Sequence, residues 1–343
     1  MGIGDATFHC IQRKDLSRSE METVIRHIME GSCSDVAVAA FLTAMHMKGE
    51  SLDEIVGAAD VMRALSIKVD TSGISNVVDI VGTGGDNESL FNVSTASVFV
   101  AAAAGASVAK HGNRSVSSSS GSADLLQQMG VNLTLSPQQV TECLRKTGIG
   151  FLFAPAYHTA MKHVATVRKQ LGFRTIFNVL GPLCNPAGVK RLMVGVFSDE
   201  LRLQYAQAFH ALDCQHVLIV HSCDGLDEIS LADDTNITEL RQGKITEYCI
   251  SPEDFGLSKN SLDGLRVNSA SESLQLIMSA FRDKEPLSER TKKTVAMIAL
   301  NAGAAMYVAG VSKTLSDGVL RAREIIHSGE ALKKMQELSN FCS

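Results

Sequence analysis

Two glycine- and serine-rich segments contain the residues best suited to bind phosphate. The first is Gly82-Thr83-Gly84-Gly85-Asp86, followed by Asn92-Val93-Ser94-Thr95. The second is Lys110-His111-Gly112-Asn113-Arg114-Ser115-Val116-Ser117-Ser118, with Ser122 shortly after it. Glycines let backbone N–H groups approach an anion without a Cβ atom in the way, and lysine, arginine and hydroxyl groups bind phosphate oxygens directly. The two segments predict a site for several phosphate groups, although such residues also form ordinary turns.

Each segment follows an apolar run that predicts a buried strand, at 77–81 and 106–110. Ser94 and Thr95 precede the alanine-rich run 96–104, and we expect them to cap a helix whose N-terminus favours an anion. Neither segment is a Walker phosphate-binding loop, because no Gly-Lys-Ser/Thr follows at the required spacing. The first segment also lacks the later glycine of the dinucleotide-binding fingerprint.

Asp227 and Glu228 are the candidate metal ligands. They follow the apolar run 216–221, which we expect to be a parallel strand, and ligands of open α/β sheets collect at the carboxyl ends of such strands. Adjacent carboxylates supply the hard oxygen atoms that Mg²⁺ prefers. An isolated Asp-Glu pair is more often a solvated surface turn, so the metal assignment depends on the surrounding motif.

The remaining chain predicts a small helical domain, 1–70, followed by a larger α/β domain, 71–343, with a mainly parallel central sheet. Ser17 with Glu20, and Ser51 with Glu54, have the spacing of helix capping boxes. Beyond a polar linker at 71–76, apolar strand candidates alternate with helical segments, which is typical of a parallel sheet. These later strand candidates are 150–154, 192–197 and 216–221, with an antiparallel addition near 236–250 and further helices after 274.

Composition indicates a soluble globular protein of the cytoplasm. Of 343 residues, 45% are hydrophobic and 20% are charged, and the formal net charge of −5 argues against sequence-independent binding of nucleic acid. The eight cysteines show no C-x-x-C spacing, which favours reduced thiols over a zinc site or a disulfide framework. The sequence shows no secretory signal, no lipidation motif and no apolar run long enough for a bilayer.

Several motifs in order closely resemble the signature of the anthranilate phosphoribosyltransferases of tryptophan biosynthesis, which share a nucleoside phosphorylase-like fold. The resemblance covers nearly the whole chain and implies transfer of a phosphoribosyl group from phosphoribosyl pyrophosphate to the amine of anthranilate, with release of pyrophosphate. Beside the two phosphate segments, it rests on Arg168-Lys-x-Leu-Gly-x-Arg-Thr-Ile-Phe-Asn178, Leu180-Gly-Pro-Leu-x-Asn-Pro186 and Asp224-Gly-Leu-Asp-Glu-Ile-Ser230.

The resemblance implies a role for individual residues of this chain. Ser94, Asp227 and Glu228 would bind magnesium, two ions per active site. Gly82, Asn113, His158 and Arg168 would contact anthranilate, and no residue is assigned as a general acid or base. The residues expected to bind phosphoribosyl pyrophosphate are Gly82, Gly85, Asp86, Asn92, Val93, Ser94, Thr95, Lys110, His111, Gly112, Asn113, Arg114, Ser115, Val116, Ser117, Ser118 and Ser122.

Some of these roles stay open from the residues alone. The guanidinium fork of Arg168 suits a carboxylate, but its basic neighbours also fit a solvated helix face. His111 could be a base, an anion contact or a packed histidine, and His158 has a similar ambiguity. The chain also departs from the family pattern, with Leu90 where threonine is common and Asn87-Glu88-Ser89 in place of a glycine-rich segment. Leu90 lacks a hydroxyl contact to phosphoribosyl pyrophosphate that the family pattern implies, and Glu88 adds a negative charge beside the loop.

The resemblance further implies a homodimer formed through the helical domain, helices near 159–186 that return to that domain, and an active site between the domains. Two other functions remain as alternatives. A pyrimidine-nucleoside phosphorylase shares this kind of fold, but Asp227, Glu228 and Arg168 argue against it. A non-catalytic, nucleic-acid-binding relative would have a basic stripe and no Asp-Glu pair.

Overall fold

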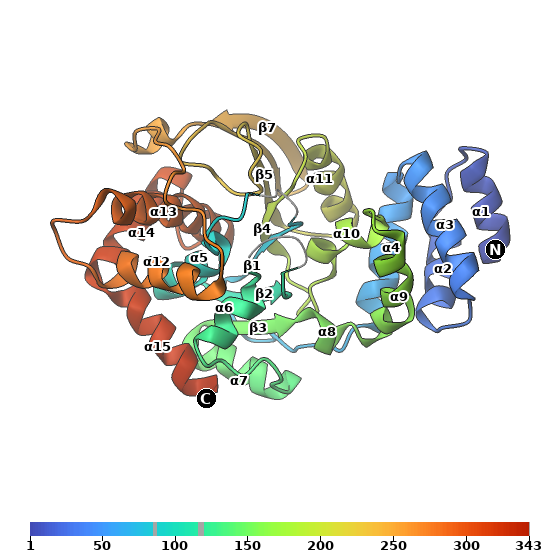
Figure 1. The fold of residues 1–343 in the computed structure, drawn as a ribbon, viewed down its shortest axis with the longest axis horizontal. Helices are drawn as coiled ribbons and strands as arrows, with labels where there is room; N and C mark the ends of the chain where they lie inside the picture. The colour runs from blue at the N-terminus through green and yellow to red at the C-terminus, as the bar shows by residue number, and fades with distance from the viewer. Residues whose placement is uncertain (85–87, 116–119, 343) are drawn as a thin grey trace.

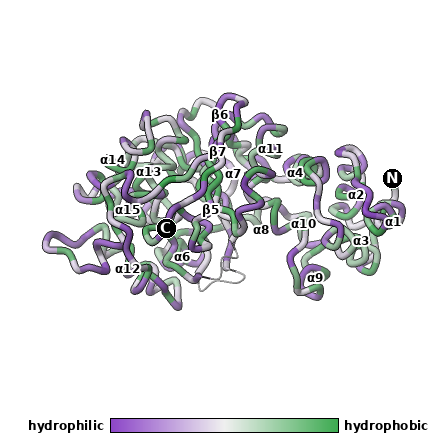
Figure 2. The backbone as a smooth tube through the Cα atoms, turned by 90° about the horizontal axis from the view of Figure 1, so that it is seen from above, coloured by the Kyte–Doolittle hydropathy of each residue, from purple (hydrophilic) through white to green (hydrophobic). Residues whose placement is uncertain are grey.

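The computed structural model describes residues 1–84, 88–115 and 120–342. The chain forms a helical unit and an α/β unit, which lie at opposite ends of an elongated molecule (Figure 1, Figure 2). The helical unit begins with four helices, α1 (Ile3–Ile11), α2 (Arg18–Met29), α3 (Asp35–Lys48) and α4 (Leu52–Leu65). The sequence prediction of a helical N-terminal region is therefore confirmed.

Both predicted capping boxes form at the starts of α2 and α4. The Ser17 and Glu20 side chains each accept the backbone N–H of the other residue, and Ser51 and Glu54 form the same reciprocal pair. These contacts satisfy N–H groups that a helix leaves without partners in its first turn. The buried Glu54 carboxylate also pairs with Lys48 over 2.8 Å, which ties the end of α3 to the start of α4.

The chain between β3 and β4 returns to the helical unit. Its elements are α8 (Ala154–Tyr157), η1 (Thr159–Met161), α9 (Lys162–Leu171), α10 (Ile176–Val179) and η2 (Gly181–Cys184). Helix α9 packs against α2 and α3, and η2 packs against α4. The approach to the end of α2 is close, since a Cβ atom on Gly31 would lie 2.8 Å from Nδ1 of His163. Within the region near 159–186, where we expected helices, a short 3₁₀ turn precedes α9.

A seven-stranded sheet organises the α/β unit, with the strand order β3-β2-β1-β4-β5-β6-β7. The first five strands in this order are parallel, and β6 and β7 join as antiparallel neighbours. This confirms the mainly parallel sheet and the antiparallel addition near 236–250. The strands are β1 (Val77–Gly82), β2 (Ser107–Gly112), β3 (Ile149–Phe153), β4 (Arg191–Gly195), β5 (His216–Ser222), β6 (Thr235–Arg241) and β7 (Lys244–Ile250).

Successive side chains of the central strands point to opposite faces of the sheet and pack into two separate hydrophobic cores. Val217 and Ile219 of β5 pack on the side of the helical unit and α11 (Leu201–Ala211). Leu218 and Val220 pack on the other face, with α5 (Val93–Ala103) and α13 (Glu289–Ala309). Burial of both faces explains why this strand is a continuous apolar run in the sequence. The other elements are α6 (Ser122–Gln128), α7 (Pro137–Thr147), η3 (Pro252–Phe255), α12 (Ala270–Arg282), α14 (Leu315–Ser328) and α15 (Glu330–Cys342).

The start of α5 differs from the sequence prediction. We expected Ser94 and Thr95 to cap a helix from residue 96, but the helix begins at Val93 and its N-cap residue is Asn92. Asn92 provides no side-chain cap, because its amide group is hydrogen bonded elsewhere. The N–H of Ser94 is satisfied instead by the Glu228 carboxylate. That partner lies far away in the sequence, so local pattern could not locate this helix end.

Disulfide bonds play no part in holding this fold together. All eight cysteines are free thiols, as their spacing predicted. Cys143 of α7 and Cys342 of α15 are nevertheless neighbours, with their Sγ atoms 3.8 Å apart in the interior. Across the described ranges, each helix is either too short or too polar to span a bilayer.

Candidate active site

The first glycine-rich segment leaves the sheet where β1 and β4 lie side by side. The strand order changes direction here, and open α/β sheets bind ligands at this switch point. A Cβ atom on Gly82 would lie 2.7 Å from Oδ2 of Asp227, and one on Gly195 would lie 1.6 Å from the Asp227 carbonyl oxygen. The N–H of Gly84 donates to the same Oδ2 over 3.0 Å. The glycines are therefore required for the close approach of the loop that carries Asp227.

The three residues predicted to bind metal come together beside this switch point. The N–H of Ser94 donates to Oε1 of Glu228 over 3.2 Å, which places that carboxylate at the N-terminus of α5. Asp227, next to it, contacts the end of β1 through Gly84. Both acidic side chains are half-buried, and both lie in the favourable positive field of backbone N–H groups.

This donor set fits Mg²⁺. Two carboxylates and the Ser94 hydroxyl offer the hard oxygen atoms that the ion prefers. Within the described ranges, no three His, Cys, Asp or Glu side chains form a cluster that could hold a metal ion without help. Mg²⁺ typically keeps several waters and binds substrate phosphate oxygens beside one or two protein carboxylates. The residues suit a metal that binds together with a phosphate-bearing substrate.

Lys110 is buried behind the acidic pair instead of projecting into solvent. Only 3% of the residue is exposed, and its Nζ donates to the carbonyl oxygen of Ile80 and lies 3.4 Å from Oγ of Ser94. Burial lowers its pKa, and the nearby charges of Asp79, Glu228 and Asp227 oppose that shift. Lys110 therefore connects β2 to β1 and to the first turn of α5, with the acidic pair near enough to influence its charge.

Asp124 holds the two described ends of the second phosphate segment. Its Oδ1 lies 3.0 Å from Nη1 of Arg114, and its Oδ2 accepts the N–H groups of Ser115 and Gly121 over 3.0 and 2.9 Å. Asp124 lies in the first turn of α6, so one carboxylate fixes both ends of the loop to that helix. Arg114, which the sequence assigned to phosphate, is thus paired with a carboxylate of the protein itself.

The other residues of the second segment meet where β2 approaches α6. A Cβ atom on Gly112 would lie 2.2 Å from Oγ of Ser122, and that hydroxyl donates to the Asn113 carbonyl oxygen over 3.4 Å. The Asn113 side-chain oxygen accepts the N–H of Arg114 over 2.7 Å. Five residues also assigned to phosphate binding lie outside the described ranges, namely Gly85, Asp86, Val116, Ser117 and Ser118.

In the first turn of α5, Ser94 is the residue that solvent reaches. Val93 and Thr95 are each only 1% exposed, and the N–H of Val93 donates to the Phe91 carbonyl oxygen. The Thr95 hydroxyl is buried with no hydrogen-bond partner within the described ranges. Asn92 is half-buried, and its side-chain oxygen accepts the Ser120 hydroxyl over 2.9 Å, which connects the two phosphate segments.

Glu88 and Leu90, which depart from the family pattern, contact the neighbouring segment at Leu265 and Arg266. Glu88 forms an ion pair with Arg266, and Leu90 forms an isolated antiparallel bridge with the same residue. The N–H of Phe91 donates to the Leu265 carbonyl oxygen over 3.0 Å. The additional negative charge near the first loop is therefore balanced within the protein.

His111 and His158 lie side by side in the interior. Their ring centroids are 5.2 Å apart, and they are 5% and 6% exposed. Burial lowers the pKa of His111 to about 3, assisted by His158, and burial lowers the pKa of His158 to about 4. Both rings are therefore neutral at pH 7, and neither is a cationic phosphate ligand. Among the described residues, Nε2 of His111 has no hydrogen-bond partner, and the backbone of Cys184 partly opposes the lowering of the His158 pKa.

The buried histidines predict loss of stability in mild acid. Both folded pKa values lie below the unfolded value of about 6.5, so the unfolded chain binds more protons and stability falls as the pH drops below that value. Asp79 opposes this over part of the range, because burial raises its pKa to about 6. We expect a net loss of about 2 kcal/mol between pH 7 and 5.5. Urea unfolding across this range measures the slope, which His158→Asn should reduce; an unchanged slope would contradict the assignment.

Arg168 presents a half-buried guanidinium without a carboxylate. Its carbon Cζ lies 5.7 Å from the ring centroid of Phe177, and its Nη2 lies 3.5 Å from Oδ1 of Asn178. Within the described ranges it forms no ion pair, and its buried Nε has no hydrogen-bond partner. A buried cation with unused donors is a site for an anion, and the planar guanidinium favours a carboxylate.

Sequence reasoning missed Asp79 and left Asn185 without a role. Asp79 is fully buried in β1, and its two oxygens accept the His111 N–H over 3.1 Å and Nδ2 of Asn185 over 2.7 Å. Nδ2 of Asn185 also donates to the Ala109 carbonyl oxygen over 2.9 Å. These bonds connect β1, β2 and the turn after η2. A lone charge within the apolar run 77–81 was the signal that could have revealed this network.

The contact at Gly195 predicts a severe effect from a single methyl group. A Cβ atom there would overlap the backbone of Asp227, which has no flexible end that could move aside. We expect Gly195→Ala to displace the acidic loop and to lower activity at least about a hundredfold. Gly4→Ala is the matched control, because a Cβ atom on Gly4 has no neighbour within 4 Å. Steady-state assays of both variants check this, and near-normal activity of Gly195→Ala would show that the loop is adaptable.

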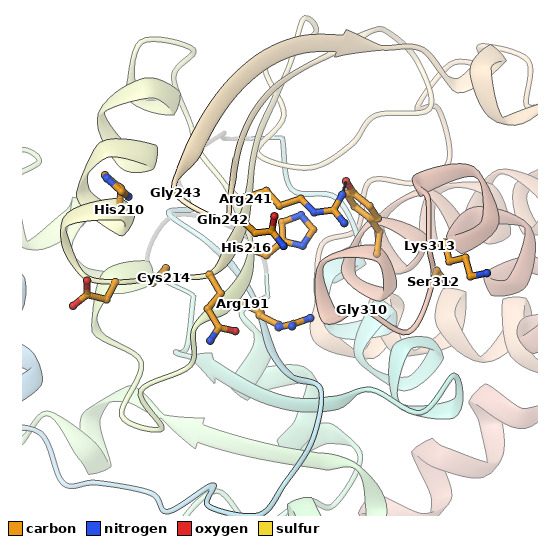
Figure 3. Close-up of a pocket in the computed structure, with 13 residues that line it drawn as sticks. Arg191, His210, Cys214, His216, Arg241, Gln242, Gly243, Gly310, Ser312 and Lys313 are labelled. Carbon is orange, nitrogen blue, oxygen red and sulfur yellow. Dashed lines mark hydrogen bonds between the residues drawn. The ribbon is translucent and has the colours of Figure 1, made fainter.

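A cavity of about 720 Å³ lies at the opposite end of the parallel strands from this site (Figure 3). It is bordered by Arg191 at the start of β4, His216 at the start of β5 and Arg241 at the end of β6. Arg191 donates to the Ala309 carbonyl oxygen at the end of α13, and Arg241 donates to the Tyr307 hydroxyl. These cations already have roles in the fold, so we place the chemistry at the switch point instead of in this cavity.

The fold and the site define a two-part glycosyl transferase. A family profile described as the helical bundle domain of the glycosyl transferase family matches residues 5–66, and one described as its a/b domain matches residues 74–332. The anthranilate phosphoribosyltransferase of Acinetobacter baumannii is 52% identical over 342 residues, which cover 99% of this chain and 97% of that protein. This chain belongs to the anthranilate phosphoribosyltransferase family, which confirms the resemblance seen in the motifs.

Solved structures agree with this assignment. The anthranilate phosphoribosyltransferase of Thermus thermophilus is 40% identical, with a TM-score of 0.89 over 98% of this chain and 99% of that one. The Saccharomyces cerevisiae enzyme, solved in complex with phosphoribosyl pyrophosphate and Mg, is 26% identical, with a TM-score of 0.88 over 99% of this chain and 97% of that one. These relatives do not favour a phosphorylase or a nucleic-acid-binding protein.

Proposed function

We propose that this enzyme transfers the phosphoribosyl group of phosphoribosyl pyrophosphate to the amine of anthranilate, giving N-(5-phosphoribosyl)anthranilate and pyrophosphate, as a step of tryptophan biosynthesis. Family membership over nearly the whole chain supports the reaction. The observation that carries it at the level of residues is the meeting of Asp227, Glu228 and Ser94 beside a glycine-rich loop at the switch point.

In this proposal, Ser94, Asp227 and Glu228 would hold two Mg²⁺ ions beside the site of the pyrophosphate group. When bound, Mg²⁺ neutralises negative charge on pyrophosphate and so makes it a better leaving group. The positive charge of the buried Lys110 attracts the carboxylates of Asp227 and Glu228 and so reduces the repulsion between them. The backbone N–H groups at Gly84 and at the start of α5 add further positive field.

The two phosphate segments would hold the ribose and phosphate oxygens of the donor. The partly exposed Ser94 in the first turn of α5 suits such oxygens, since its neighbours Val93 and Thr95 are buried. Asp124 accepts the N–H groups of Ser115 and Gly121 at the two ends of the second segment. Ends that are held in place before binding lose less entropy when the substrate arrives.

Anthranilate would bind with its carboxylate at Arg168, beside Asn113, His158 and Gly82. The unused donors of Arg168 support this orientation. Anthranilate has a neutral amine at pH 7, so its nitrogen carries a lone pair before any proton transfer. We therefore assign no general base, and the depressed pKa values of His111 and His158 agree with a role in lining the site.

Rate enhancement in this proposal comes from positioning and electrostatics. The bond from the anomeric carbon to pyrophosphate breaks as the amine nitrogen bonds to that carbon from the opposite face, through a transition state that resembles an oxocarbenium ion. The acidic N–H of the resulting ammonium group then gives its proton to water or to the departing pyrophosphate. Holding donor and acceptor in line replaces a bimolecular encounter. The fixed cations and N–H groups stabilise the charge that develops on pyrophosphate. No covalent intermediate with the enzyme is required.

We also propose that the protein is a homodimer of two-domain subunits, with domains 1–70 and 71–343, that works in the reducing cytoplasm. The helical unit exposes the large apolar side chains of Phe8, Val36 and Met47, which are 58%, 80% and 78% exposed in the single chain. These side chains all come from α1 and α3, and apolar exposure that is concentrated on one unit favours a protein interface there. The eight free cysteines support a reducing compartment.

The test of the function follows anthranilate fluorescence after adding phosphoribosyl pyrophosphate and Mg²⁺ to the purified protein. We expect the signal to fall, and EDTA in excess of the metal to stop that fall. A flat signal from folded protein that still binds phosphoribosyl pyrophosphate would contradict the acceptor assignment. Turnover of thymidine with free phosphate would instead support a phosphorylase.

A further inference from the structure

Three segments far apart in the sequence meet at Asn92. Its backbone N–H donates to Oγ of Ser273 over 2.9 Å, and that hydroxyl donates to Oδ1 of Asn92 over 2.7 Å. The Ser120 hydroxyl donates to the same Oδ1 over 2.9 Å. Nδ2 of Asn92 donates in return to the Ser120 carbonyl oxygen over 3.0 Å. We name these three residues the Asn92 junction.

The junction connects both phosphate segments to α12. Asn92 is the N-cap residue of α5, and Ser120 directly precedes the start of α6. Ser273 lies in the first part of α12 and is fully buried. Helix α12 packs against α6 and α13, so the hydroxyl of Ser273 is fixed by the core of the α/β unit. None of the sequence motifs includes this serine.

The hydrogen bonds determine how the Asn92 amide is oriented. A carboxamide has one oxygen acceptor and two N–H donors. Two hydroxyl donors converge on Oδ1, which places the oxygen and therefore the NH₂ group. One N–H goes to Ser120, and the other has no partner among the described residues, so it is available to a ligand oxygen.

We propose that Ser273 is a positioning residue for phosphoribosyl pyrophosphate, which orients Asn92 and holds the two phosphate-binding segments at a fixed separation. This inference rests on the proposed function. Removing the hydroxyl takes one of two donors from Oδ1 of Asn92 and leaves the Asn92 N–H without its partner. Since an unmade hydrogen bond in the interior is unfavourable, the segment should shift or the amide should rotate.

Steady-state kinetics of Ser273→Ala test this role. We expect the KM for phosphoribosyl pyrophosphate to rise about tenfold, the effect of one misplaced hydrogen-bonding group. The KM for anthranilate and kcat should stay close to those of the wild type, because the residues proposed to bind anthranilate are not part of the Asn92 junction. Ser279→Ala on the same helix is the matched control, since its hydroxyl makes no hydrogen bond within the described ranges.

A second variant keeps the inference testable if Ser273→Ala folds poorly. Ser120→Ala removes the other donor to Oδ1, and we expect it to raise the same KM selectively. If both single variants fold, their effects should be less than multiplicative in the double variant, because they act on one amide group. Multiplicative effects would show that the two serines act independently of each other, which would overturn the inference.

The outcomes distinguish this inference from the proposed function. An equal rise in both KM values, or a lower melting temperature with unchanged kinetic constants, would show that Ser273 is merely structural. An active wild type whose Ser273→Ala variant keeps the wild-type KM for phosphoribosyl pyrophosphate would contradict the inference alone. A wild type without transferase activity would contradict the proposed function itself.

Discussion

Replacing Asp227 with asparagine and Glu228 with glutamine should nearly abolish activity while leaving the fold intact. The new amides keep a carbonyl oxygen that can accept the N–H groups of Gly84 and Ser94, so the local hydrogen bonds can persist. What is lost is the negative charge that binds Mg²⁺. We expect a fall in kcat/KM of at least about a thousandfold. The fluorescence assay measures it, and the melting temperature checks the fold.

Asp233→Asn is the matched control for this prediction. Asp233 lies on the same connection between β5 and β6 and pairs with Lys259 at the surface. Exposed ion pairs contribute little to stability, so this variant should behave as the wild type. Calorimetry adds a second measurement, because the double variant should lose the Mg²⁺ dependence of phosphoribosyl pyrophosphate binding. If that dependence persists, the metal ligands lie elsewhere.

Replacing Arg168 with alanine should weaken the binding of anthranilate without affecting the binding of phosphoribosyl pyrophosphate. The variant loses the unpaired guanidinium and its contacts to Phe177 and Asn178. We expect the KM for anthranilate to rise roughly 10- to 100-fold, the effect of losing a charged hydrogen-bonding partner. The KM for phosphoribosyl pyrophosphate should stay near the wild-type value. Arg168→Lys should recover only part of the loss, because an ammonium group cannot bind a carboxylate through two parallel hydrogen bonds.

Two comparisons make the Arg168 prediction specific. Lys169→Ala changes the next residue of α9, which is exposed, and should leave both KM values unchanged. 2-Aminobenzamide lacks the carboxylate of anthranilate, so wild type and Arg168→Ala should use it equally poorly. A large difference between the two proteins with this acceptor would show that Arg168 acts on something other than the carboxylate.

The sequence alone predicted the fold class because its signals are local. Buried strands such as 216–221 are apolar on both faces, and the capping boxes at Ser17 and Ser51 depend on residues three positions apart. The phosphate segments and the Asp-Glu pair were found from residue types and motifs. What these signals lack is the partner of each polar group.

Tertiary structure decided those partners. It brought Glu228 to the N–H of Ser94, buried Lys110 behind the acidic loop and paired Arg114 with Asp124. It also brought Asp79, which sequence reasoning had not singled out, into hydrogen bonds with His111 and Asn185. Each of these contacts joins residues that the chain path separates, and burial then sets their charge states. Sequence by itself determined which chemical groups this protein has, and packing determined which of them face a substrate, because a polar group's partner depends on distance in space.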